Sequence, residues 1–240
     1  MTDRVFYNCG TSAAMGYAEA YLKRHGCRFS PVPEADVTHL LLDVPYSGDP
    51  IPSTIPRDAT IIGGRLGNLS GIDLLKSPDY LAENADITAH CAVKILLQKL
   101  PVTLKACPIL VIGWGRIGKC LSQLLRNMGA HVTIAARKPE DRAIIEALGY
   151  HALDTAALDY GLVSFRVLIN TAPTIILDSD ALSYCQNTCL KIDLASNPGI
   201  EGSDVLWARG LPSKEAPESS GILIGKTILR LIASGKDVSS

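Results

Sequence analysis

The sequence lacks any apolar run of the about 18 residues that a membrane-spanning helix needs, so a membrane protein is not expected. It also lacks a surplus of either charge, because 23 Lys and Arg residues are balanced by 24 Asp and Glu residues. A net charge of −1 gives no general attraction to nucleic acid or to an anionic membrane, and neither partner is expected. The first ten residues lack the apolar core of a signal peptide, so we expect a cytoplasmic location.

The seven cysteines include no C-x-x-C pair, and an odd number of scattered cysteines is typical of reduced, mostly buried thiols. Cys185 and Cys189 have the spacing of one helix face, but no further Cys or His lies near them in the sequence. We therefore expect neither a disulfide framework nor a metal site. The remaining composition, 47% hydrophobic and 20% charged over 240 residues, is that of a globular protein with one large domain or two small ones.

Short apolar runs alternate with segments of helical periodicity along the sequence. Strands are predicted at 5–8, 39–44, 60–63, 108–112, 131–135, 150–153, 167–170, 190–194 and 205–208. Helices are predicted at 14–25, 87–97, 117–128, 140–148 and 220–233, and loops at 45–56 and 210–217. Strands separated by helices pair in parallel, so the predicted fold class is α/β, with a Rossmann-type doubly wound sheet in the second half and a smaller α/β unit in the first.

The strongest chemical signal is a glycine-rich turn that follows the predicted strand 108–112 and opens the next helix. It consists of Gly113, Trp114, Gly115, Arg116, Ile117 and Gly118. The first glycine permits the tight turn, the second lets a diphosphate approach the backbone, and the third lets the helix approach the sheet. The free N–H groups and the dipole at the helix start favour a phosphate. This context predicts a dinucleotide site, although such a turn also occurs in folds that bind nothing.

The end of the next predicted strand indicates which dinucleotide binds. An Asp or Glu there would bind the ribose 2′-hydroxyl of NAD, whereas a cation suits the 2′-phosphate of NADP. The chain has Arg137 and Lys138 at this point, and no carboxylate before Glu140. NADP is therefore the predicted cofactor and NAD the less favoured one. The alternative is a pair of solvated surface cations without a ligand.

Two further polar turns follow strands at the same predicted edge of the sheet, where ligands of such folds bind. The first contains Asn170, Thr171, Ala172 and Pro173, and the second contains Asp193, Leu194, Ala195, Ser196 and Asn197. Their amide groups could border the nicotinamide, but these residue types are also common in ordinary strand-exit turns. Lys214, in the predicted loop before the last helix, could bind a substrate carboxylate or be idle.

These motifs stand in the order and at the spacing of one known family. The segments are VIGWGRIG (111–118), GAHVTIAARK (129–138), INTAP (169–173), DLASNPG (193–199) and GLPSKEAP (210–217). Over about residues 105–235 the sequence resembles the A subunit of dipicolinate synthase. The resemblance implies a small α/β lobe on the substrate side at 1–104 and an NAD(P)-binding Rossmann domain at 105–240. It also implies that the last helix, at 220–234, packs back on the N-terminal lobe.

The resemblance further implies a reaction, partners and residue roles. The reaction is the NADP-dependent oxidation of dihydrodipicolinate, a small dicarboxylate, to dipicolinate in the mother cell of a spore-forming bacterium. The implied partner is a flavoprotein-like B subunit. A homo-oligomer stays open, because the sequence does not reveal the oligomeric state. Carried over to this sequence, the glycine turn holds the pyrophosphate, and Arg137 and Lys138 hold the 2′-phosphate. The turns at 170–173 and 193–197 surround the nicotinamide and the substrate.

The first lobe departs from the family, because it is tens of residues shorter than usual and matches only faintly, apart from Asn84 and Thr88. His90 stands where a Glu is expected. It is a candidate proton acceptor, although a His on a helix face more often only packs or caps. The predicted catalytic residues are His90, Lys214 and Ser196. Lys214, Arg65 and the start of the last helix are candidates for binding the two ring carboxylates.

Two other enzyme classes fit the sequence poorly, and a third, non-catalytic function fits it better. A D-2-hydroxyacid dehydrogenase needs an Arg after the Asn-Thr turn and a late catalytic His, but this chain has Pro173 there and no His beyond His151. An enzyme similar to S-adenosylhomocysteine hydrolase needs a longer substrate domain and NAD. An NADP-binding homologue without catalysis, acting as a regulatory or assembly partner, stays open.

Overall fold

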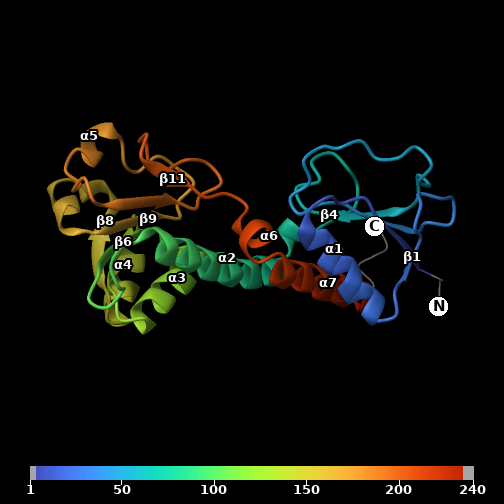
Figure 1. Ribbon diagram of the computed structural model, residues 1–240, viewed down its shortest axis with the longest axis horizontal. Coiled ribbons are helices and arrows are strands. Elements are labelled where there is room, and N and C mark those ends of the chain that lie inside the picture. The colour runs from blue at the N-terminus through green and yellow to red at the C-terminus, as the bar shows by residue number, and fades with distance from the viewer. Residues whose placement is uncertain (1–3, 235–240) are drawn as a thin grey trace. The chain divides into compact units, whose positions relative to one another are not determined.

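The computed structural model describes residues 4–234, and the chain divides into two compact units (Figure 1). Unit 1 contains the described residues up to Ile87 and those from Pro212 onward, and unit 2 is Thr88–Leu211. The sequence predicts a single boundary between residues 104 and 105, whereas the chain leaves unit 1 within a long helix and returns to it near Leu211. Residues 1–3 and 235–240, which belong to the two predicted domains, lie outside the described part.

Unit 1 contains a parallel sheet of five short strands. These are β1 (Val5–Asn8), β2 (Arg28–Phe29), β3 (His39–Leu41), β4 (Thr60–Gly63) and β5 (Ile72–Asp73), in the order β2-β1-β3-β4-β5. This is a doubly wound strand order of the flavodoxin type. Strands β2 and β5 were not predicted, because two-residue strands carry no apolar pattern.

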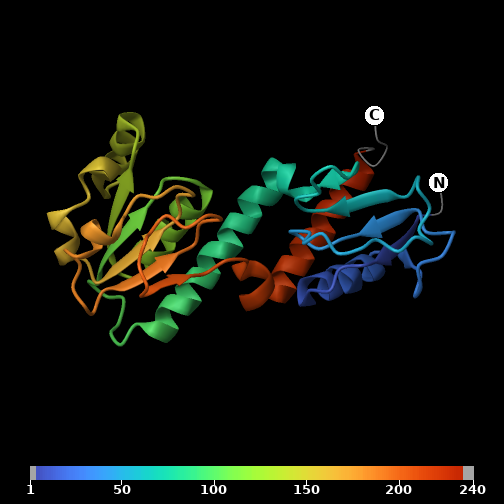
Figure 2. The same cartoon turned by 90° about the horizontal axis from the view of Figure 1, so that it is seen from above.

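One face of this sheet is covered by α1 (Ala13–Arg24) and α7 (Pro217–Ala233), which are drawn blue and red in Figure 2. The buried cluster combines strand residues such as Phe6 and Ile62 with Met15 and Leu22 of α1 and Ile224 of α7. On the other face, Leu40 and Leu42 of the β3 region pack against side chains of the proline-rich 45–56 segment, which is a loop as predicted. The last helix therefore completes the core of unit 1.

Gly221 of α7 fits closely against α1. A Cβ atom there would lie 2.4 Å from the carbonyl oxygen of Ala14 and 2.8 Å from the backbone nitrogen of Ala18. We expect Gly221→Ala to lower the free energy of unfolding by about 2–3 kcal/mol, because two packed backbones must separate. Gly16→Ala in α1 is the matched control, since its Cβ would have nothing within 4 Å.

The control substitution should raise the free energy of unfolding by about 0.5–1 kcal/mol through the better helix propensity of alanine. Urea denaturation followed by circular dichroism compares the two variants. Equal effects of Gly221→Ala and Gly16→Ala would contradict the close helix contact.

Unit 2 contains a six-stranded parallel sheet with the Rossmann strand order. Its strands are β6 (Pro108–Ile112), β7 (His131–Ala136), β8 (His151–Asp154), β9 (Val167–Asn170), β10 (Leu190–Asp193) and β11 (Val205–Trp207). The order is β11-β10-β9-β6-β7-β8, so the winding direction reverses between β6 and β9. The predicted parallel, doubly wound α/β fold is confirmed, and the predicted limits of β6 and β9 agree with the structure at both ends.

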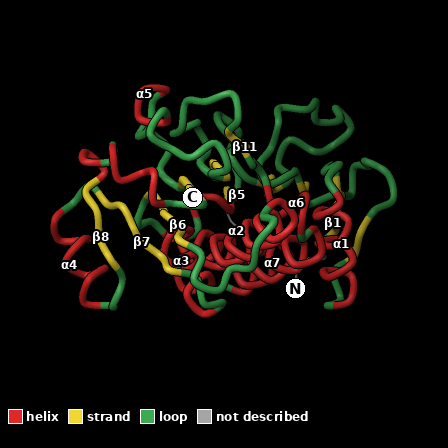
Figure 3. Tube along the Cα trace, turned by 60° about the vertical axis from the view of Figure 1, so that its left-hand side comes forward, coloured by secondary structure: helices red, strands yellow, loops and turns green. Residues whose placement is uncertain are grey.

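Three helices lie between strands of this sheet (Figure 3), namely α3 (Arg116–Asn127), α4 (Pro139–Ala147) and α5 (Ser179–Leu182). Helix α2 (Pro78–Lys99) precedes β6 and is shared by the two units, and α6 (Leu211–Glu215) follows β11 and belongs to unit 1 from Pro212 onward. Short 3-10 turns occur at η1 (Leu74–Lys76), η2 (Thr155–Ala157) and η3 (Tyr160–Ser164). Among residues 4–234, no helix is both long and apolar enough to cross a membrane.

Three local predictions were wrong. Helix α2 begins at Pro78 rather than at residue 87, because a proline and an acidic residue open its first turn before the apolar periodicity starts. The predicted loop at 210–217 contains the helix α6, on which Lys214 lies. Cys185 and Cys189 do not share a helix face, because α5 ends at Leu182 and both cysteines lie in turns before β10.

Candidate nucleotide-binding site

The glycine-rich turn lies between β6 and α3, at the carboxyl edge of the sheet beside the reversal point between β6 and β9. This crevice is where open α/β sheets bind their ligands. Gly115 is the N-cap residue of α3, and Arg116 begins the helix. Within the described chain, no side chain caps this helix start, and its first turn carries no acidic residue. The uncapped N–H groups therefore favour an anion.

The three glycines of the turn have different surroundings. Gly113 has φ +105°, and a Cβ atom there would lie 2.5 Å from Oγ1 of Thr171. A Cβ atom on Gly118 would lie 2.1 Å from the carbonyl oxygen of Gly113. These two glycines are required by the fold itself. Gly115 differs, because φ is −77° and its Cβ would have nothing within 4 Å. The chain itself therefore does not require glycine at this position, and the space beside it is open to a molecule outside the chain.

The end of β7 presents Arg137 and Lys138 to solvent. Arg137 makes no ion pair within residues 4–234, so its guanidinium is available to a ligand. Arg142 holds the backbone at the end of β7, because its Nη1 donates to the carbonyl oxygens of Ala136 at 2.9 Å and Arg137 at 2.8 Å. The same Nη1 lies 2.9 Å from a carboxylate oxygen of Asp154. Arg142, which no sequence motif marks, thus fixes the turn that carries both cations.

The two polar turns beyond β9 and β10 are joined by a buried network. Asn170 and Asp193 are both fully buried, and Nδ2 of Asn170 donates to Oδ1 of Asp193 at 2.9 Å. The Asp193 carboxylate also accepts the backbone N–H groups of Ala195 at 2.9 Å, Gly199 at 2.6 Å and Ile200 at 3.1 Å. These four donors compensate the burial of the carboxylate. The two side chains therefore hold the turns in place, and their predicted contact with a cofactor stays a prediction.

Other members of these turns lie closer to the surface. Thr171 donates its hydroxyl to the carbonyl oxygen of Ile112 at 2.9 Å, which ties the first turn to the end of β6. Leu194 and Ala195 are buried, whereas Ser196 and Pro173 are exposed. The turns thus border the same edge as the glycine loop, with Ser196 open to solvent.

The remaining predicted catalytic residues, His90 and Lys214, and the predicted carboxylate-binding Arg65 do not all belong to one unit. His90 is exposed on the part of α2 that belongs to unit 2. Lys214 and Arg65 are residues of unit 1, of which Arg65 is exposed. The structure therefore brings together the predicted nucleotide residues of unit 2, while the roles of Lys214 and Arg65 stay predictions.

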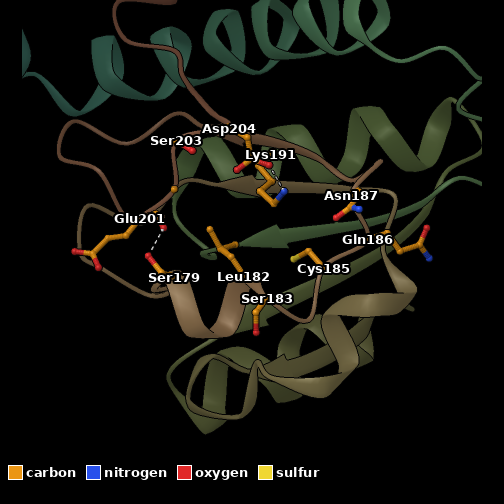
Figure 4. A pocket seen from close by; sticks show the side chains of 11 residues that line it. Ser179, Leu182, Ser183, Cys185, Gln186, Asn187, Lys191, Glu201, Ser203 and Asp204 are labelled. Atoms are coloured by element: carbon orange, nitrogen blue, oxygen red, sulfur yellow. Dashed lines mark hydrogen bonds and ion pairs between the residues drawn. The ribbon is translucent and has the colours of Figure 1, made fainter.

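Unit 2 also contains a cavity that is separate from the crevice at the glycine turn. It lies toward the amino ends of β10 and β11 (Figure 4). Its volume is about 390 Å³, and Nζ of the buried Lys191 lies there 2.6 Å from a carboxylate oxygen of Asp204. Burial raises the pKa of the Cys185 thiol, which lines the cavity, and raises that of Cys189 to about 12. Both thiols thus stay protonated near neutral pH, which suits neither metal binding nor nucleophilic chemistry. Among the described residues, no group of three or more His, Cys, Asp or Glu side chains could hold a metal ion.

Comparison with known proteins identifies a protein that is similar in sequence to this chain. No protein-family model matches the sequence. The A subunit of dipicolinate synthase from Bacillus subtilis (strain 168) is 28% identical over 170 residues, which cover 68% of this chain and 57% of that protein. The crystal structure of the same synthase component from Bacillus halodurans superimposes with a TM-score of 0.84 at 20% identity, covering 96% of this chain and 98% of the other. In sequence and in fold, the chain is similar to the A subunit of dipicolinate synthase.

The predicted resemblance to this family is confirmed, although the matched region spans little more than half of the curated relative. A transhydrogenase from Sinorhizobium meliloti shares the fold more distantly, with a TM-score of 0.76 at 14% identity, covering 98% of this chain and 95% of that chain. The dipicolinate synthase family and this transhydrogenase thus have the same two-sheet architecture. At such identities the structural likeness establishes the fold alone.

Proposed function

We propose that the chain is an NADP-dependent oxidoreductase that converts dihydrodipicolinate to dipicolinate. The observation that carries the cofactor proposal is the open space at Gly115, at an uncapped helix start on the same sheet edge as the unpaired Arg137. Similarity to the A subunit of dipicolinate synthase supports the choice of substrate.

The proposed reaction removes one hydride and one proton from the substrate ring. Bound NADP⁺ would supply the hydride acceptor, and the ring becomes aromatic as the proton leaves. The N–H groups from Gly115 to Gly118 would bind the diphosphate, and Arg137 with Lys138 would bind the 2′-phosphate. The turns after β9 and β10 would position the nicotinamide and exclude water.

The catalytic assignments extend this proposal. His90 would accept the ring proton, Ser196 would hydrogen-bond the substrate, and Lys214 would bind one of its carboxylates. The curated relative is named as one component of a synthase, which supports assembly with another component, and a flavoprotein-like B subunit is the proposed partner. The proposed setting is the mother cell of a spore-forming bacterium.

A second candidate function is NADP binding without turnover. It is favoured by the limited match, which covers 57% of the curated relative. Incubating the chain with NADP⁺ and freshly generated dihydrodipicolinate, with and without a B subunit, distinguishes the two. Formation of NADPH together with the aromatic product supports the enzyme, whereas tight NADPH binding without product in either mixture supports the second candidate.

Arg137→Asp should reverse the coenzyme preference. A carboxylate there would repel the 2′-phosphate and could accept a hydrogen bond from the 2′-hydroxyl of NAD. We expect the ratio of the Kd values for NADPH and NADH to change by about 100-fold, from the loss of one or two charge-assisted hydrogen bonds. Calorimetric titration with both coenzymes measures this ratio.

Lys105→Asp is the control, because it makes the same change of charge at an exposed site before the amino end of β6. This variant should keep the original preference. If Arg137→Asp and Lys105→Asp behave alike, Arg137 does not bind the 2′-phosphate.

A further inference from the structure

A groove of about 370 Å³ lies between α3 and α4 on unit 2. Its walls come from Trp114 of the glycine turn, Lys119 and Arg126 of α3, Ile144 of α4, and Leu148 and Tyr150 of the segment that leads to β8. Arg126, Leu148 and Tyr150 lie near the amino ends of the strands, whereas the nucleotide site lies at their carboxyl ends. The groove shares Trp114 with the glycine turn, and the proposed function assigns no role to its other lining residues.

Two aromatic rings form one part of the groove and hold two cations in place. The ring centroids of Trp114 and Tyr150 are 6.3 Å apart, with the rings edge to face. Nζ of Lys119 lies 5.5 Å from the centroid of Trp114, and the guanidinium carbon of Arg126 lies 4.2 Å from that of Tyr150. Arg126 also donates to the carbonyl oxygen of Leu148 at 2.7 Å. Cation–π contacts of this kind orient charged groups without neutralising them.

The charged side chains that line the groove are all positive. Its lining contains two cations and no carboxylate, and neither Lys119 nor Arg126 makes an ion pair within the described residues. The apolar part is unusually exposed, because Ile144 and Leu148 each leave about half of their surface in contact with solvent, at 50% and 53%. An apolar surface beside uncompensated positive charge fits a ligand with a flat apolar body and a negative group.

We propose that this groove is a second ligand site, which binds an aromatic or heteroaromatic carboxylate. The ring would pack on Ile144 and Leu148 and against the edge of Trp114. The carboxylate would lie between the Lys119 ammonium and the Arg126 guanidinium, which can bind it with charge-assisted hydrogen bonds. This site does not depend on catalytic turnover by the chain.

Benzene-1,3-dicarboxylate is the probe, used on the full chain in which Trp207→Phe leaves Trp114 as the one tryptophan reporter. We expect saturable quenching of Trp114 fluorescence with a Kd of about 1 mM or tighter. Pentanedioate, which has the charges without the ring, and benzyl alcohol, which has the ring without the charges, should each bind at least about tenfold more weakly.

Substitutions inside and outside the groove test where the probe binds. Lys119→Gln and Arg126→Gln should each weaken binding about tenfold, whereas Lys105→Gln should not change it. Lys119 is exposed, so its variant tests the site even if Arg126→Gln disturbs the contact with Leu148. Gly115→Val should leave probe binding intact while it blocks the nucleotide site.

Three results would overturn the proposal. The first is the absence of saturable quenching, and the second is binding of pentanedioate as tight as that of benzene-1,3-dicarboxylate. The third is loss of probe binding in Gly115→Val but not in Lys119→Gln. The last result would place the probe in the nucleotide site, and it would leave the proposed cofactor untouched.

Discussion

Gly115→Val is expected to lower the affinity for NADP(H) by at least about 100-fold while the protein remains folded. The added side chain meets nothing within 4 Å of its Cβ, and a φ of −77° is open to valine, so the chain itself accommodates it. The branched side chain would, however, stand where the diphosphate must contact the N–H groups that open α3. Losing two charge-assisted hydrogen bonds at about 1.5–3 kcal/mol each corresponds to this fall in affinity.

The cost to stability should stay near 1 kcal/mol, because valine is only a poorer N-cap residue than glycine. Gly161→Val is the matched control, since its Cβ also meets nothing within 4 Å but it lies in η3, outside the proposed site. Isothermal titration calorimetry should show unchanged binding for this control. An unchanged affinity in Gly115→Val as well would mean that the diphosphate lies elsewhere.

Asp193→Ala is expected to lower the free energy of unfolding of unit 2 by about 3–5 kcal/mol. The substitution removes the acceptor for four donors at once, namely Nδ2 of Asn170 and three backbone N–H groups in the turn that follows β10. Each buried donor left without a partner costs about 1–3 kcal/mol, and relaxation of the turn recovers part of the sum. The residue is fully buried, so water cannot replace the carboxylate without local opening.

Tryptophan fluorescence during urea denaturation is the suitable measurement, because both tryptophans of the chain, Trp114 and Trp207, belong to unit 2. Asp180→Ala is the control, since Asp180 is exposed on α5 and should change the stability by less than about 1 kcal/mol. A loss below about 1 kcal/mol for Asp193→Ala would show that the network does not hold the two turns.

The sequence predicted the Rossmann unit well because its strands are buried on both faces and read as unbroken apolar runs. The run at 108–112 followed by the glycine turn placed β6 and the start of α3 within one residue. Local chemistry was also sufficient to identify the glycine turn and the two cations after β7, since these signals lie within a few consecutive residues.

Features that depend on long-range packing were not predictable. Asn170 and Asp193 were identified as polar residues of strand-exit turns, but their inward orientation follows from the pairing of β9 with β10, in which the two residues stand side by side. Arg142 reaches across the turn to Asp154 on β8, a contact that neither residue signals alone. The return of the last helix to the first lobe was implied only by the family resemblance, because the pattern of apolar positions does not contain the fit of Gly221 against α1.

Calorimetric titration of the full chain with NADPH and with NADH tests the nucleotide site most directly. The site built from Gly115 and Arg137 predicts one molecule of NADPH per chain, bound at least about tenfold more tightly than NADH. Tighter binding of NADH, or no binding of either coenzyme to the folded chain, would contradict it.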